Sequence, residues 1–141
     1  MLKKTLVGLV VCLGLSSGVV ASDKLQENMG NLAGSLSSLQ MGFLTNDKKM
    51  AISSAESLRK HISVYLDDKD AITKLLPSEI QYKSSIAINS AHMINKYALQ
   101  IEKVLKDKNI RMINRQMRSQ KAFLDIQNQC FRCHNLVRDW E

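Results

Sequence analysis

The sequence is short of the residues that β-sheets and disulfide frameworks need. No glycine occurs from residue 43 to residue 141, and Pro77 is the only proline. Tight turns between strands rely on glycine for positive φ angles, so this absence argues against a sheet protein and for long helices. Of the three cysteines, one lies at position 12, and only Cys130 and Cys133 lie outside the N-terminal segment. A disulfide scaffold is therefore excluded.

Residues 1–21 have the composition of a secretory signal peptide. Lys3 and Lys4 form a positive start, residues 6–15 form a short apolar run, and small residues precede a cleavage site after Ala21. The apolar run is too short for a membrane span. We therefore expect a periplasmic protein with a single mature domain at residues 22–141 and no stable membrane insertion after signal cleavage.

The charge balance is moderately basic. Removal of Lys3 and Lys4 with the signal lowers the formal net charge from +7 to +5. This basicity suits an acidic protein partner or an anionic membrane surface, and equally a solvated surface with no partner. The basic residues are scattered among Asp and Glu rather than gathered in a patch, and export argues against nucleic acid. We expect no nucleic-acid partner.

Apolar residues recur at intervals of three and four along four stretches of the chain, which predicts four amphipathic helices. These stretches span residues 25–43, 51–65, 80–105 and 113–137. The first and second, and the third and fourth, are joined by short turns, so each pair must be antiparallel. The predicted fold is an all-α, antiparallel up-down-up-down four-helix bundle.

Local signals suggest where these helices begin and end. Ser22 or Asp23 is a candidate N-cap of the first helix. Residues 46–47 break the first apolar pattern, and residues 107–109 form the turn before the last helix. Residues 66–76 read as a longer connection, after which Pro77 suits the first turn of the third helix.

Residues 130–134 read Cys-Phe-Arg-Cys-His, which is the C-x-x-C-H motif at which haem is attached in c-type cytochromes. Two thiols one helical turn apart can each form a thioether with a vinyl group of one porphyrin. The histidine directly after the second thiol then lies under the iron as its proximal ligand. A redox dithiol is usually found where a helix begins after a strand, and a zinc site needs a second cysteine pair. The motif therefore predicts one haem c per chain, attached through Cys130 and Cys133 with His134 on the iron.

A four-helix chain of this size, with an export signal and C-x-x-C-H in its last helix, resembles the class II cytochromes c, which comprise the cytochrome c prime family and its low-spin relatives. The resemblance implies a haem buried between the helices near one end of the bundle, often in a homodimer. It implies either five-coordinate iron that binds small gases, or six-coordinate iron, with a methionine of the first helix as ligand, that carries electrons. It also implies that Arg138 packs near the proximal histidine and the haem. Alternatively, Arg138 is a basic residue that favours the helix dipole.

The sixth ligand decides between these two roles. In an antiparallel bundle, the level of His134 matches the start of the first helix and the end of the second. At the start of the first helix, Met29 is the one residue of the inward stripe with a donor atom, so it either binds the iron or packs in the core. His61 near the end of the second helix is the competing ligand, although a boundary or surface position is the expectation. His92 lies too far along the third helix and is expected to be structural.

These observations lead to one predicted function and one alternative. The prediction is an exported monohaem cytochrome c that transfers electrons to and from other exported redox proteins, as a monomer or a homodimer. The alternative is the binding of small gases such as nitric oxide in a pocket lined by Leu25, Met29 and Leu32. An enzyme would need a distal acid or base over the iron, and no residue is convincingly placed for that role.

Overall fold

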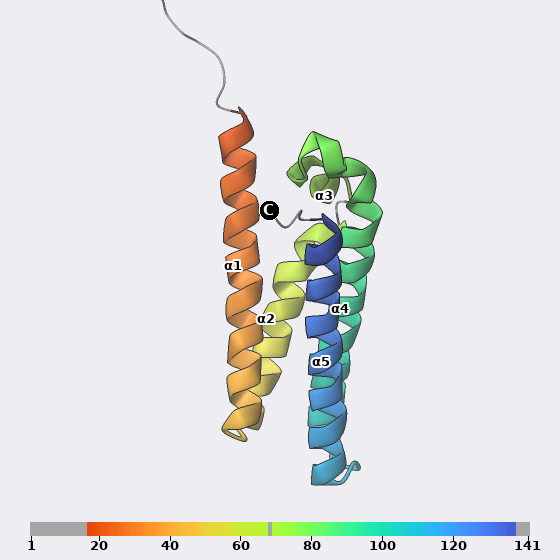
Figure 1. Cartoon of the computed structure of the whole chain (residues 1–141). Helices are drawn as coiled ribbons and strands as arrows, with labels where there is room; N and C mark the ends of the chain where they lie inside the picture. The colour runs from red at the N-terminus through yellow and green to blue at the C-terminus, as the bar shows by residue number, and fades with distance from the viewer. Residues whose placement is uncertain (1–16, 68, 138–141) are drawn as a thin grey trace, which may run out of the picture.

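The computed structural model describes residues 17–67 and 69–137, which are almost entirely helical and contain no strand. The prediction of an all-α fold is confirmed for this part of the chain. There are five α-helices and one 3₁₀ helix, η1 (Figure 1). In chain order they are α1 (Ser17–Leu44), α2 (Lys48–Asp67), α3 (Lys69–Leu75), η1 (Ser78–Lys83), α4 (Ser84–Lys106) and α5 (Met112–Val137).

The four long helices lie side by side (Figure 1). In this view the chain descends along α1, rises along α2, descends along α4 and rises along α5. α1 packs against α2, α2 against α4, and α4 against α5, whereas α1 and α5 make only slight contact. The short α3 and η1 lie at the end of the molecule where α2 stops and α4 starts (Figure 1).

The turn between α1 and α2 has a capping structure that explains its shortness. Asn46 adopts a positive φ of 54°, the left-handed conformation that commonly ends a helix. The Asp47 N–H then donates to the Gly42 carbonyl at 2.8 Å, and the Asn46 N–H donates to the Phe43 carbonyl at 3.3 Å. The Asp47 carboxylate accepts a bond from the Met50 N–H at 2.9 Å, which caps the start of α2. The predicted break at residues 46–47 is therefore confirmed.

The predicted boundaries of the third helix are wrong. Residues 66–76 are not a plain connection, because α2 continues to Asp67 and α3 follows it. Pro77 does not begin the long helix: its ψ of 145° is extended, and the Ile80 N–H donates to its carbonyl at 3.0 Å. This tight i to i+3 bond starts η1 first, so α4 begins only at Ser84.

The candidate caps of the first helix are also wrong for the full-length chain. α1 already begins at Ser17, so Ser22 and Asp23 lie inside it. No proline interrupts residues 17–25, and the helix extends through the predicted cleavage site after Ala21. Cleavage at that site would make Ser22 the first residue of the shortened helix.

The buried core occupies the middle of the molecule and the end formed by the two short turns. It draws on α1, α2, α4 and α5, with Ile72 of α3 added at the other end. None of residues 26–34 of α1, 84–89 of α4 or 127–135 of α5 is buried. The core members are Leu39, Ala51, Ala55, Leu58, Ile62, Ile72, Ala91, Ile94, Ala98, Ile101, Leu105, Ala122, Phe123 and Ile126.

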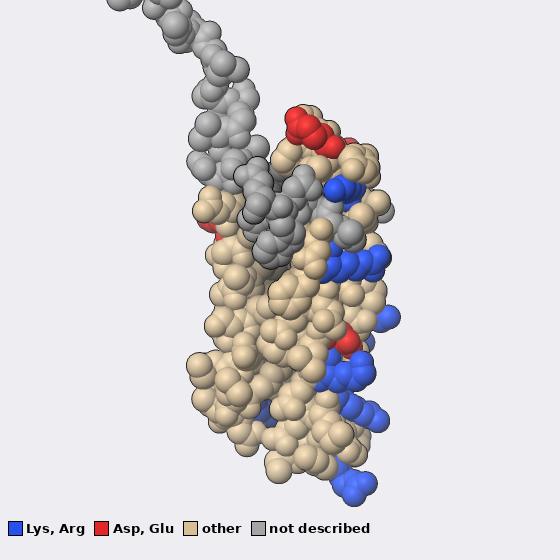
Figure 2. All heavy atoms as spheres, in the orientation of Figure 1, with Lys and Arg blue, Asp and Glu red and all other residues tan. Residues whose placement is uncertain are grey.

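Charge is unevenly distributed on the surface. Lys and Arg side chains lie along one edge of the molecule, over α4 and α5, while the visible face of α1 is nearly free of charge (Figure 2). Within residues 17–67 and 69–137, no helix has both the length and the hydropathy needed to cross a lipid bilayer.

Candidate functional site

The C-x-x-C-H motif lies in the last turns of α5. Cys130, Cys133 and His134 are each half-buried, while the intervening Phe131 and Arg132 are exposed. Cys130 packs against the edge of the buried core. A spacing of three residues places the two thiols one turn apart on the same side of the helix. The helix thus holds both sulfurs toward the protein and turns the residues between them outward.

The electrostatics of the two thiols disfavour a reactive dithiol. Both cysteines are free. Burial raises the pKa of Cys130 and of Cys133 above the ordinary thiol value, and the proximity of Cys133 raises the pKa of Cys130 further. Reactive dithiols instead have lowered pKa values, often at a helix N-terminus, whereas this pair lies near a C-terminus. The thiols stay protonated near neutral pH, as suits a structural attachment point better than disulfide exchange.

Two contacts set the alignment of α5 with α1. The rings of Phe43 and Phe123 meet edge to face with centroids 5.8 Å apart. One residue past the end of α1, the Asn46 side-chain oxygen accepts a bond from the Gln116 amide at 2.9 Å. His134 lies 18 residues, or five full turns, after Gln116 and therefore on the same side of α5. The proximal-ligand candidate is thus on the side of α5 that faces α1.

Met29 lies on the matching side of α1. It precedes Phe43 by 14 residues, and Leu36 lies midway, so the three form one line along the helix. Eleven residues from the Phe43–Phe123 contact bring α1 to Leu32 and α5 to His134, about 16 Å along each axis. Met29 lies about one turn beyond that level and is 37% exposed. It is therefore not packed in the core.

The buried core ends just before the motif. Its last member on α5 is Ile126, one turn before Cys130. Beyond it lie apolar side chains of three helices that are only partly covered: Leu32 and Leu36 of α1, Ala87 and Ile88 of α4, and Cys130 of α5. The motif thus stands where apolar side chains converge without a buried layer between them. The thiols, the imidazole and this apolar surround fit a flat, largely apolar prosthetic group.

The other candidate residues contribute less. His61 on α2 is half-buried, as expected for a boundary position, and His92 on α4 is exposed rather than part of the core. Arg138 lies outside the described residues. Within the described part of the chain, no three His, Cys, Asp or Glu side chains converge to hold a metal ion. The described side chains therefore do not form the four-ligand set that a structural zinc site needs.

Sequence reasoning missed two buried polar atoms near the motif. The Ser90 hydroxyl and the Gln129 side-chain oxygen are buried without a hydrogen-bond partner among the described residues. α4 and α5 are antiparallel across a short turn, and Ser90 lies as far before Lys106 as residue 128 lies after Met112. Both groups therefore lie at about the same level of the α4–α5 contact. No sequence signal marks them, because serine and glutamine in helices are usually exposed.

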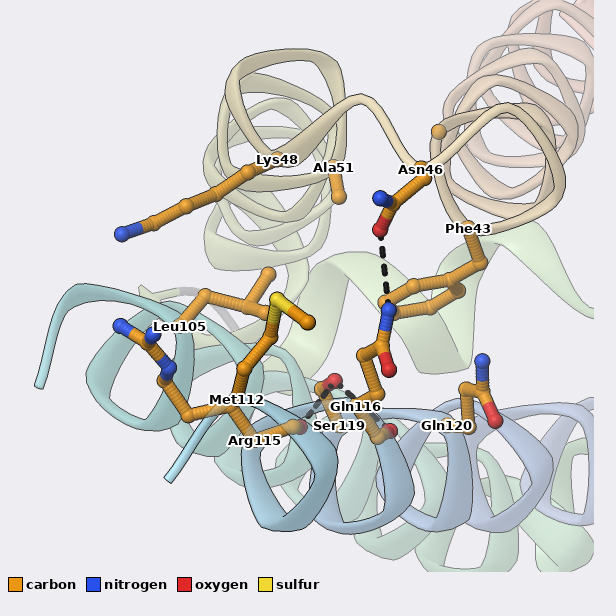
Figure 3. A pocket seen from close by; sticks show the side chains of 11 residues that line it. Phe43, Asn46, Lys48, Ala51, Leu105, Met112, Arg115, Gln116, Ser119 and Gln120 are labelled. Carbon is orange, nitrogen blue, oxygen red and sulfur yellow. Dashed lines mark hydrogen bonds between the residues drawn. The ribbon is translucent and has the colours of Figure 1, made fainter. Parts of the chain in front are cut away.

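A pocket lies at the opposite end of the molecule, beside the two short turns (Figure 3). Phe43, Leu105 and Met112 supply its apolar lining. The Lys48 and Arg115 side chains extend toward the same side of it in Figure 3. None of its lining residues belongs to the motif. The pocket is therefore a feature of the end at which α1 and α5 are tied together, separate from the candidate haem site.

Comparisons of this chain with protein-family models, with curated proteins and with solved structures found no match.

Proposed function

We propose that this chain is an exported monohaem cytochrome c whose main role is electron transfer. The observation that carries the proposal is the coincidence of two features at one end of the molecule. The C-x-x-C-H motif presents its thiols and imidazole there, and the buried core stops one turn short of it. We infer that the four long helices form an antiparallel up-down-up-down bundle, with the haem completing the core at this end.

Each motif residue has a distinct task in this proposal. Cys130 and Cys133 bind the haem covalently, and their common side of α5 fixes its orientation. His134 holds the iron from the side of α5 that faces α1. Bound haem supplies an iron that gains and loses one electron. The partly covered apolar side chains around the motif exclude water from the haem, and burial of this kind is one of the means by which a protein adjusts the reduction potential.

Export and the partner class follow from the signal peptide. Covalent haem attachment at C-x-x-C-H and a signal at residues 1–21 together support a periplasmic location. Cleavage after Ala21 removes residues 17–21 from α1 and leaves Met29 and Leu32 in place. The partners are then other exported redox proteins.

The direct test is the absorption spectrum of protein matured in a periplasm, both oxidised and reduced. We expect the α and β bands of a ferrous c-type haem that stays bound after denaturation. A Cys130→Ala/Cys133→Ala variant should retain no covalent haem, while Cys12→Ala should mature normally. Absence of haem from the matured wild-type protein would overturn the proposal.

The exposure of Met29 favours one second candidate, the binding of small gases. A side chain that is 37% exposed and outside the core is not held against an iron by the surrounding structure. If Met29 does not bind the iron, the sixth position is open to carbon monoxide or nitric oxide. A reduced spectrum that shifts when carbon monoxide is added would select this function, and an unchanged low-spin spectrum would select electron transfer.

A further inference from the structure

α5 carries an unusual line of exposed apolar side chains. Ile113, Met117, Leu124 and Phe131 are 57%, 62%, 56% and 64% exposed. Their spacings of four, seven and seven residues place them on one side of the helix, along about 27 Å of its length. Apolar side chains scattered singly on a surface need no explanation, but a contiguous line of large ones marks an interaction site.

One flank of this line is basic. Arg118 follows Met117 in the sequence, Arg132 follows Phe131, and Lys121 lies between them on the same flank; all three are exposed. The one acidic residue of α5, Asp125, forms an ion pair with Lys121 at 3.0 Å and is thereby partly neutralised. These residues belong to the edge along which Lys and Arg gather in Figure 2. The apolar line therefore has a positive border.

The opposite flank is uncharged. This flank continues through Gln120 toward the side of α5 that meets α1. Residues 28–46, most of α1 and the turn after it, include no charged residue. The resulting α5 face, defined by Ile113, Met117, Leu124 and Phe131 with Arg118, Lys121 and Arg132, has an apolar centre bordered by positive charge on one side only.

We propose that the α5 face is the docking site of an acidic redox protein that exchanges electrons with the haem. This inference rests on the proposed function. Phe131 and Arg132 lie between the two cysteines, so a partner on this face would sit directly against the haem-bearing turn. Positive charge raises the rate of encounter with an acidic partner, and the apolar line supplies contact once the two proteins meet.

Two other occupants fit the face less well. A second copy of this chain would bring like charge against a net charge of +7, and against +5 after signal cleavage. A lipid bilayer would have to bury the amides of Gln120 and Gln127, which lie beside the apolar residues. Burial of an amide without a hydrogen-bond partner is costly, whereas a protein surface can supply one.

The test is the rate at which a reduced flavodoxin, an acidic one-electron donor, reduces the matured haem protein in stopped-flow experiments. Arg118→Glu/Lys121→Glu should lower the second-order rate constant about tenfold at low ionic strength and leave it nearly unchanged at high salt. Met117→Gln/Leu124→Gln should lower it about threefold or more at both salt concentrations. The matched control Lys49→Glu/Lys60→Glu makes the same charge change on α2 and should stay within about twofold of wild type.

The outcomes separate this proposal from the one on which it rests. Dithionite should reduce every variant at the wild-type rate, which shows that the haem is intact. If the haem is intact and the α5 variants react with flavodoxin as wild type does, the docking site is overturned and the cytochrome assignment stands. A matured protein without haem would overturn both. A wild-type dimer that Met117→Gln/Leu124→Gln dissociates in sedimentation would identify a second copy as the occupant. Flotation with phosphatidylglycerol vesicles that those substitutions abolish would identify a membrane, and either result would overturn the proposal.

Discussion

At the scale of single residues, Ser90 and Ser119 offer a matched pair of buried hydroxyls. Both lie in long helices and are at most 2% exposed. The Ser119 hydroxyl contacts the carbonyl oxygens of Arg115 at 2.6 Å and Gln116 at 3.1 Å, whereas the Ser90 hydroxyl has no partner among the described residues. An unpaired buried polar group carries a desolvation cost that alanine removes.

We therefore expect Ser90→Ala to raise the free energy of unfolding by about 1 kcal/mol, since alanine is also the better helix former. Ser119→Ala loses hydrogen bonding as well and should lower the free energy of unfolding or leave it unchanged. Denaturant titration followed by circular dichroism measures both values. Equal effects of the two substitutions would show that the Ser90 hydroxyl has a partner in solution.

Met29 gives a second comparison at this scale, with Met41 as its control. The two methionines lie on α1 and are 37% and 49% exposed, so each change to alanine should lower the free energy of unfolding by less than about 1 kcal/mol. If Met29 binds the iron, Met29→Ala alone converts the matured protein to a high-spin form that binds carbon monoxide. Identical spectra of the Met29→Ala and Met41→Ala variants would exclude Met29 as a ligand.

The part of the candidate site that could be predicted from sequence is the part whose chemistry depends on local spacing. Cys130, Cys133 and His134 lie within five consecutive residues, and any helix places them together. The exposure of Met29 depends instead on how closely α1 approaches α5, which no local pattern encodes. The same holds for Gln129, whose burial follows from the packing of α4 against α5.

At the scale of elements, α1 and α2 approach closely because Gly42 has no side chain. A Cβ atom at this position would lie 2.8 Å from the backbone nitrogen of Ala51, and backbone cannot yield as a flexible side chain can. Gly34, two turns earlier on the same helix, would meet nothing within 4 Å. The two glycines therefore separate packing from helix propensity.

Gly42→Ala should lower the free energy of unfolding by about 1–3 kcal/mol, because the two helices must move apart. Gly34→Ala should raise it by about 0.5–1 kcal/mol, because alanine favours the helix and meets no neighbour. Thermal and denaturant unfolding of the two variants provide the measurement. Stabilisation by Gly42→Ala would contradict the close approach of α1 and α2.

The contact between α2 and α4 depends on a buried charge. The Glu102 side chain is only 8% exposed, and it pairs with the Arg59 guanidinium at 3.0 Å and with Lys106 at 3.7 Å. Arg59→Met leaves this carboxylate with its weaker partner, so we expect the free energy of unfolding at pH 7 to fall by about 2–3 kcal/mol. Glu56→Gln removes only the exposed pair with Lys106 and should cost less than about 1 kcal/mol. Similar small losses in both variants would show that Glu102 is solvated in solution.

The four long helices could be predicted from their apolar periodicity because each buries one continuous side against the core. The short elements could not. α3 contributes one core residue, Ile72, and one buried position forms no periodic pattern. η1 has no buried residue at all, and its start depends on the extended conformation of Pro77. A proline is equally compatible with the first turn of an α-helix and with the tighter turn observed here.

At the scale of the whole molecule, the two ends are built differently. At the end with the short turns, α1 and α5 are joined by the Phe43–Phe123 contact, and the Asn46–Gln116 hydrogen bond ties the turn after α1 to α5. At the motif end, none of residues 26–34 or 127–135 is buried, so the facing parts of these helices have little to hold them. A haem bound at the motif would supply the missing contact, and the stability of this end should then depend on haem attachment.

Hydrogen exchange tests this dependence. In the haem-free Cys130→Ala/Cys133→Ala variant, amides of residues 26–34 should exchange faster than those of residues 36–44, because local opening exposes little apolar surface there. In the matured protein, exchange at residues 26–34 should slow by about tenfold or more, since a haem packed against α1 makes opening costlier. Residues 51–58 of α2, which already contribute three core side chains, serve as the internal control and should change little. Equal exchange at residues 26–34 with and without haem would mean that the haem does not lie between α5 and α1.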